Sequence, residues 1–96
     1  MTRSRIFLVS YDIAEPRRWR RVFKLLRENG EHQQLSVFIC RLPVARMKRL
    51  AARLAMLTDP AQDRLMVIEL GTAADAARRI GGAQPAILRP PPHVVV

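Results

Sequence analysis

The 96-residue sequence has few of the residues that build common catalytic and metal sites. Its single cysteine, Cys40, permits neither an intrachain disulfide nor a multi-cysteine zinc site. Its two histidines, His32 and His93, form no recognisable triad and no histidine–cysteine metal spacing, and no glycine-rich phosphate loop is present. These absences exclude most hydrolases with a nucleophilic triad, zinc-site proteins and P-loop nucleotide-binding proteins.

Long hydrophobic runs are also absent. The apolar run near the N-terminus, Ile6-Phe7-Leu8-Val9, has four residues, far too few for a signal peptide or a membrane span. We therefore expect a cytoplasmic protein without membrane contact, and the single cysteine agrees with a reducing compartment. Because about half of the residues are hydrophobic and a quarter are charged, the composition is that of one globular domain.

Acidic residues are scarce relative to basic ones, with 8 Asp and Glu against 17 Lys and Arg. The excess is concentrated in residues 1–48, which carry 11 basic and 4 acidic residues. Fifteen of the 17 basic residues are arginine, and arginine suits bidentate contact with phosphate. The charge balance favours a nucleic-acid partner; a GC-rich genome, which favours arginine codons, is the alternative explanation.

Hydrophobic periodicity predicts alternating strands and helices. Residues 5–11 are apolar on both faces, which is typical of a central buried strand. Pro16 suits the first position of a helix and Gly30 its end. The expected strands are 5–11, 31–41 with a break near Leu35-Ser36, 64–70 and a short 77–80, and the expected helices are 16–29 and 43–57.

This order, β-α-β-β-α-β with a short extra strand, predicts an α+β ferredoxin-like fold, in which two helices cover one face of an antiparallel sheet. No third helix is expected, although the strands are apolar on both faces. A second copy of the chain is the simplest cover for the other face, so we expect a homodimer packed sheet to sheet. The domain is expected at 1–82, followed by a proline-rich tail at 83–96 that is either disordered or an arm adding an edge strand to a partner.

The predicted first helix has an apolar stripe and a basic face. The basic side chains are not interleaved with acids, and such a face is either solvated surface or a contact for phosphates. We favour the phosphate contact. The residues of this face are Arg17, Arg20, Arg21, Lys24 and Arg27.

Asp12 differs from the other acids because it ends the buried central strand just before the basic helix. Mg²⁺ often needs only one or two protein carboxylates, with water and substrate phosphates completing its shell. Two Asp12 residues facing each other across a twofold axis could share one ion. The alternatives are a cap of the loop or helix, or an ion pair with Arg17 or Arg18. Glu28, Glu31, Asp59, Asp63 and Asp75 are expected as caps or solvated charges, and Glu69 as an edge or paired residue.

Three segments occur together in one pattern. They are 7–13 (Phe-Leu-Val-Ser-Tyr-Asp-Ile), 21–26 (Arg-Val-Phe-Lys-Leu-Leu) and 30–38 (Gly-Glu-His-Gln-Gln-Leu-Ser-Val-Phe). In order and spacing, these segments resemble the CRISPR-associated Cas-two family, whose signature has Gln-x-Ser-Val-Phe as its core. The resemblance covers residues 5 to about 70.

The resemblance implies a ferredoxin-like homodimer that is a Mg²⁺-dependent endonuclease on single-stranded RNA or double-stranded DNA, with Asp12 as metal ligand. It also implies a role in acquiring CRISPR spacers, in which the dimer bridges two dimers of the Cas-one integrase on duplex DNA. The family's basic positions fall on Arg17, Arg18 and Arg21, whereas Trp19 stands where some relatives carry another arginine. Tyr11, Ser36 and Phe38 match the family's motifs, and strand packing at the dimer interface is their expected role.

These observations leave three hypotheses. The first is a Mg²⁺-dependent phosphodiesterase in which Asp12 holds the ion and the arginines balance charge. The second is a catalytically silent scaffold that contacts the nucleic-acid backbone without reading its sequence; the lack of a clear general base favours it. The third is a ribonuclease toxin of similar fold.

Overall fold

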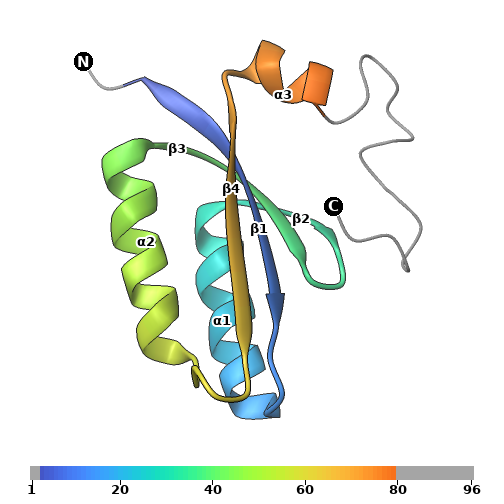
Figure 1. Cartoon of the computed structure of the whole chain (residues 1–96), viewed down its shortest axis with the longest axis vertical. Coiled ribbons are helices and arrows are strands. Elements are labelled where there is room, and N and C mark those ends of the chain that lie inside the picture. The colour runs from blue at the N-terminus through green and yellow to red at the C-terminus, as the bar shows by residue number, and fades with distance from the viewer. Residues whose placement is uncertain (1–2, 80–96) are drawn as a thin grey trace.

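The computed structural model describes residues 3–79. They form a four-stranded antiparallel sheet and three helices (Figure 1). The strand order is β2-β3-β1-β4, so β1 is the central strand that was predicted and β2 and β4 are edges. The elements are β1 (Ser4–Asp12), α1 (Pro16–Asn29), β2 (Glu31–Gln34), β3 (Val37–Pro43), α2 (Val44–Leu57), β4 (Arg64–Gly71) and α3 (Ala73–Arg79).

The predicted ferredoxin-like α+β fold is confirmed. The first helix has the predicted bounds, and the second begins at Val44, one residue later than predicted, because Pro43 still belongs to β3. The predicted break is also present, since Leu35 and Ser36 form the turn between β2 and β3. Glu69 lies on the edge strand β4 and pairs with Arg5 at 2.7 Å, as expected.

The larger of two hydrophobic clusters lies between the sheet and the layer of α1 and α2. Val9 and Phe38 from the sheet, Leu26 from α1 and Leu54 from α2 are fully buried in it. Full burial of each such side chain contributes about 1.5–3 kcal/mol. This core fixes the position of α1, and so the position of its basic residues, relative to the central strand.

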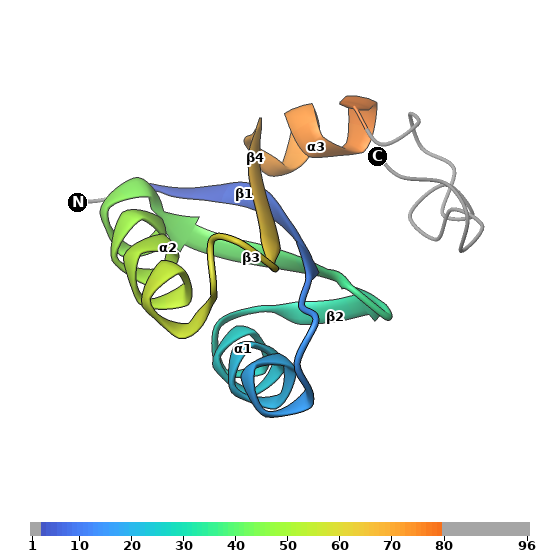
Figure 2. The same cartoon turned by 60° about the horizontal axis from the view of Figure 1, so that its bottom comes forward.

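A smaller cluster lies on the other face of the sheet, where it joins Ile6, Leu8, Leu70 and Ala76. Ala76 belongs to α3, which lies on the side of the sheet opposite α1 and α2 (Figure 2). Further apolar side chains on this face, Val37, Ile39 and Ile68, are only partly buried. We call this side of the sheet the open face; α3 covers part of it.

Two predictions about this region were wrong. Residues 77–79 belong to helix α3 rather than to an extra strand, and α3 is a third helix where none was expected. The helix begins with a reciprocal cap in which Thr72 Oγ1 accepts from the Asp75 backbone N–H at 3.2 Å and Asp75 Oδ2 accepts from the Thr72 N–H at 3.1 Å. This Thr-x-x-Asp pattern was the available signal, and the capping role expected of Asp75 is confirmed.

Among residues 3–79, no helix is long and apolar enough to cross a membrane. The predicted tail at 83–96, and the predicted end of the domain at 82, lie outside the described residues.

The buried carboxylate of Asp63 joins three segments of the chain. Its side chain is 1% exposed and pairs with Arg18, whose Nε donates to Oδ2 at 2.8 Å. The backbone N–H of Ala14 donates to Oδ1 at 2.9 Å, and that of Asp59 donates to Oδ2 at 2.8 Å. Asp63 thus connects the loop after β1, the first turn of α1 and the turn before β4, and the expectation of a cap or solvated charge missed its buried ion pair.

This connection predicts a pH dependence of stability. The Arg18 hydrogen bond lowers the pKa of Asp63 from 3.8 to about 2, against the opposing effect of burial. Because the folded-state pKa is lowered, Asp63 stabilises the fold above about pH 4, and this contribution is lost as the pH falls toward 2. At pH 7, Asp63→Asn should lower the midpoint of thermal unfolding measured by circular dichroism. The difference in midpoint between this variant and the wild-type protein should disappear as the pH falls from 4 to 2.

Asp59→Asn is the matched control, because it alters a carboxylate of the same turn that accepts from the Ala61 N–H and makes no ion pair among the described residues. At pH 7, Asp59→Asn should lower the thermal midpoint by less than Asp63→Asn does. Equal losses for the two variants at every pH would contradict the connecting role of Asp63.

Candidate metal and nucleic-acid site

Asp12 is the last residue of β1, and its side chain is exposed. Because side chains alternate along a strand, Asp12 shares the open face with Ser10, Leu8 and Ile6. Ile6 pairs with Gly71, two residues before the start of α3, so Asp12 lies at the end of the open face that is remote from α3. Within the described part of the chain, the Asp12 side chain takes part in no hydrogen bond or ion pair.

One copy of the chain supplies few potential metal ligands around Asp12. Arg64 lies opposite Asp12 on β4 and is exposed, and residues 3–79 contain no group of three His, Cys, Asp or Glu that could hold an ion. Carboxylate oxygen is nonetheless the donor that Mg²⁺ prefers, and one or two carboxylates with water are enough. The donor chemistry therefore fits Mg²⁺ where a second copy adds its own Asp12.

The structural roles considered for Asp12 are filled by two other acids. Glu15 Oε1 caps α1 by accepting from the Arg18 backbone N–H at 2.7 Å, and this hydrogen bond lowers the pKa of Glu15. Asp63 makes the ion pair with Arg18 that Asp12 was considered for. The Asp12 carboxylate is therefore left available for a ligand.

The basic residues of α1 divide into two kinds. Arg18 is held by Asp63, which raises its pKa, so this guanidinium already has a partner. The other five are exposed, and none of them forms an ion pair with another described residue. They are Arg17, Arg20, Arg21, Lys24 and Arg27.

An aromatic cluster supports part of this basic surface. Trp19 stacks on Phe23 with ring centroids 5.1 Å apart, and His32 of β2 meets the Phe23 ring at 5.2 Å. The Arg27 guanidinium lies 5.8 Å from the centroid of the same ring, within the range of a cation–π contact. The spacing of residues 19, 23 and 27 along the helix was a signal for this row, whereas nothing in the sequence indicated that His32 joins it.

The residues matching the family motifs lie around the start of β3. The Tyr11 hydroxyl donates to the Leu35 carbonyl at 3.2 Å, and the Tyr11 N–H donates to the Ser36 carbonyl at 3.1 Å. Phe38 is fully buried on the side of the helices. Strand packing is thus observed for Phe38, but the open face, through which the dimer is expected, lies on the other side of the sheet.

Burial moves the pKa values of two titratable groups further above neutral pH. It raises the pKa of Tyr11 to about 12 and that of the Cys40 thiol to about 11. The phenol is therefore a hydrogen-bond donor rather than a base, and the thiol is not a nucleophile.

Comparisons with known proteins show to which family the chain is related. The family described as CRISPR associated protein Cas2 matches residues 5–78. A Rhodospirillum rubrum protein described as CRISPR-associated endoribonuclease Cas2 1 is 45% identical over 69 residues, which are 72% of this chain and 68% of that protein. CRISPR-associated endoribonuclease Cas2 of Geobacter sulfurreducens is 37% identical over 75 residues, which are 78% of this chain and 79% of that protein.

Solved structures of similar proteins have the same fold. The crystal structure of Streptococcus pyogenes Cas2 at pH 6.5 superposes with a TM-score of 0.68 at 31% identity, covering 78% of this chain and 94% of the other. The Thermus thermophilus protein TT1823 superposes with a TM-score of 0.66 at 36% identity, covering 69% and 80%. Since the family match extends from the central strand through most of α3 and the relatives share more than a third of their aligned residues, the chain belongs to the CRISPR-associated Cas2 family.

Proposed function

We propose that this protein is a Mg²⁺-dependent nuclease of the spacer-acquisition step of CRISPR systems and that it works as a homodimer. The observation that carries the proposal is the Asp12 carboxylate at the end of β1 on the open face. It is exposed and has no hydrogen-bond or ion-pair partner among residues 3–79. Relatives described as endoribonuclease and endonuclease support cleavage of phosphodiester bonds in general. Family membership favours this role over that of a ribonuclease toxin of similar fold.

In this proposal, Asp12 of each copy binds the ion. When bound, Mg²⁺ supplies Lewis acidity that polarises a phosphate or lowers the pKa of a water. Arg17, on the first turn of α1, binds phosphate oxygens and stabilises the negative charge of the transition state. Arg21 faces α2 and contributes to backbone binding only. Arg18 has a positioning role, because its pairing with Asp63 holds the start of α1 next to the end of β1.

The substrate class is single-stranded RNA or duplex DNA. Exposed arginines on one helix contact phosphates, which carry no sequence information. Binding by this surface is therefore independent of base sequence.

A second candidate function is a scaffold that bridges Cas-one-type integrase dimers on duplex DNA. The observation that favours it is a contrast within residues 3–79. Five exposed cations of α1 form no ion pair there, whereas the candidate metal site has a single carboxylate. The cations suffice for backbone binding, whereas Asp12 belongs to no larger cluster of potential ligands among residues 3–79. The two functions are compatible in one protein.

The dimer can be tested on the open face. Sedimentation equilibrium at micromolar concentration should give about twice the chain mass of 11.0 kDa. Ile68→Glu, which places a charge among the partly buried residues of the open face, should shift the protein toward monomer because the carboxylate would be buried in the interface. Val67→Glu is the matched control. Val67 is the neighbour of Ile68 on β4, is 40% exposed and, like its pairing partner Val9, lies on the helical face of the sheet, away from the expected interface. An unchanged protein that stays monomeric would exclude a metal site shared by two Asp12 residues.

The role of Asp12 can be tested by Asp12→Asn, which keeps the shape of the side chain and removes its charge. Mg²⁺-dependent cleavage of single-stranded RNA and duplex DNA should fall by about 100-fold or more, because the metal ligand is lost. Glu31→Gln, which removes an exposed carboxylate elsewhere, should retain activity. Sedimentation should show that Asp12→Asn remains a dimer.

Full nuclease activity in Asp12→Asn would refute the catalytic assignment. If the wild-type protein binds duplex DNA but does not cleave nucleic acid in the presence of Mg²⁺, the scaffold is the supported function. A large loss of thermal stability in Asp12→Asn would instead indicate a structural role for Asp12.

Backbone binding predicts a specific dependence on salt. If the five exposed cations of α1 each meet a phosphate, the logarithm of the affinity for duplex DNA should fall with the logarithm of salt concentration at a slope of about −4 to −5. Fluorescence anisotropy with duplexes of unrelated sequence should give similar affinities. A slope near zero, or a strong preference for one sequence, would contradict backbone binding.

A further inference from the structure

Arg64 is the first residue of β4 and lies directly opposite Asp12, the last residue of β1. Two residues paired in this way point to the same face of an antiparallel sheet, with their Cβ atoms about 5 Å apart. Both residues are exposed. Arg64 therefore extends from the open face beside the candidate metal ligand.

The strand register distinguishes Arg64 from the other cations of the sheet. The strands of the described chain carry two further arginines, Arg5 and Arg41. Arg5 is engaged in an ion pair, whereas Arg41 lies opposite Ile6, six residues from Asp12 along β1. Six residues of a strand span about 20 Å, so Arg64 is the cation of the described sheet that lies next to Asp12.

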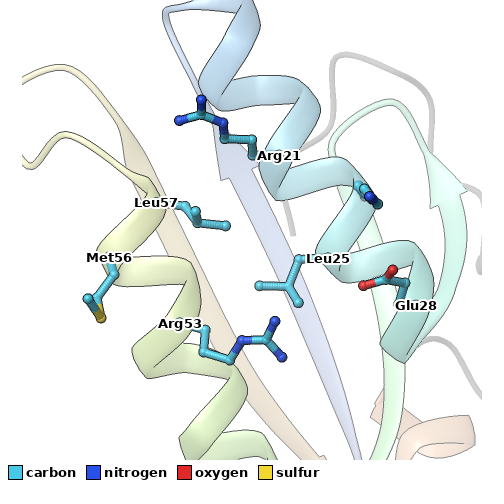
Figure 3. A pocket seen from close by; sticks show the side chains of 7 residues that line it. Arg21, Leu25, Glu28, Arg53, Met56 and Leu57 are labelled. Carbon is cyan, nitrogen blue, oxygen red and sulfur yellow. The ribbon is translucent and has the colours of Figure 1, made fainter.

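Cations of the two long helices are directed elsewhere. Figure 3 shows Arg21 reaching from α1 toward α2 and Arg53 reaching from α2 toward α1. Both helices pack on the face of the sheet opposite the open face. Arg64, in contrast, shares its face with Asp12.

The buried Asp63 carboxylate holds both strand ends in place. Asp63 directly precedes Arg64, and its Oδ1 accepts from the backbone N–H of Ala14, two residues after Asp12. Its ion pair with Arg18 further restrains the carboxylate. The backbone positions of Asp12 and Arg64 are thus set before a ligand binds, which lowers the entropic cost of forming a site.

The two neighbouring charges are opposite in sign, but they are not paired. Among the described residues, neither Asp12 nor Arg64 forms an ion pair with the other or with a third residue. The carboxylate is a donor for a metal ion, and the guanidinium is a donor for phosphate oxygens. Together they complement a ligand that carries both signs, such as a metal ion with a bound phosphate.

Charge balance indicates what Arg64 adds to the proposed metal site. The carboxylates of two Asp12 residues equal the charge of one Mg²⁺ ion, so the ion and its protein ligands are neutral together. A phosphodiester is negative, and its negative charge increases in the transition state of hydrolysis. Two Arg64 guanidinium groups, one from each copy, supply the compensating positive charge.

We propose that Arg64 is a catalytic residue, which binds an oxygen of the scissile phosphate beside the ion held by Asp12 and stabilises the charge of the transition state. The proposal rests on the proposed function, because it requires an ion at Asp12. Before nucleic acid binds, the positive charge of Arg64 repels that ion. The same side chain therefore weakens metal binding and promotes cleavage.

The first test measures metal binding without nucleic acid. Mn²⁺ is the probe, because it prefers oxygen ligands as Mg²⁺ does and its electron paramagnetic resonance signal reports the free ion. Arg64→Ala should bind Mn²⁺ about 3- to 10-fold more tightly than the wild-type protein, because a positive charge beside the ion is removed. Arg64→Lys keeps this charge, and Arg41→Ala removes a charge far from Asp12, so both should change the affinity by less than about 2-fold.

The second test measures cleavage of single-stranded RNA and duplex DNA at saturating Mg²⁺. Arg64→Ala should lower kcat by about 100-fold. Arg64→Lys should restore part of the activity, because lysine keeps the charge but not the bidentate contact, and Arg41→Ala should stay within about 2-fold of the wild-type kcat. Tighter metal binding together with slower cleavage does not result from misfolding, which would weaken both.

An unchanged kcat in Arg64→Ala, or Mn²⁺ binding no tighter than that of Arg41→Ala, would overturn the role of Arg64. In either case the proposed function stands as long as Asp12→Asn loses both Mn²⁺ binding and cleavage. A wild-type protein that neither binds Mn²⁺ nor cleaves nucleic acid would overturn both proposals.

Discussion

The buried Asp63 carboxylate organises the end of the molecule where the candidate metal ligand lies. It accepts from the Ala14 backbone, from the Arg18 guanidinium and from the Asp59 backbone, so one side chain sets the distance between the end of β1 and the start of α1. Such a buried acceptor is stable only when its hydrogen bonds are satisfied together. The Asp12 side chain forms no hydrogen bond or ion pair among residues 3–79, and Asp12 lies two residues before Ala14, whose backbone N–H Asp63 holds.

Much of the fold follows from the sequence because its local signals agree with one another. The helix over 16–29 has a proline at its start, an apolar stripe and a glycine after its end, and the structure reproduces those bounds. The helix α3 was missed because its seven residues are mostly alanine and arginine, which give no hydrophobic period to read. Its signals were the Thr72 and Asp75 cap and the high helix propensity of alanine and arginine, and a search for periodicity detects neither.

The residues of the candidate site could be predicted from the sequence only where their side chains form no ion pair with a residue distant in the chain. Asp12 and the five exposed cations of α1 are identified by their place along the chain, and they form no ion pair with another residue of 3–79. Arg18 looked equivalent to its neighbours, but its partner Asp63 is 45 residues away in sequence. No local pattern encodes such a contact, because it depends on how β1, α1 and β4 are packed.

The position of α3 has a consequence for how two copies can fit together. Among residues 3–79, α3 covers the end of the open face near Ile6 and Leu70 but not the end that carries Ser10 and Asp12. In the proposed homodimer, α3 would block a partner from sitting at the centre of the sheet. The partner would be displaced toward the other end, and this offset would bring the two Asp12 carboxylates closer together.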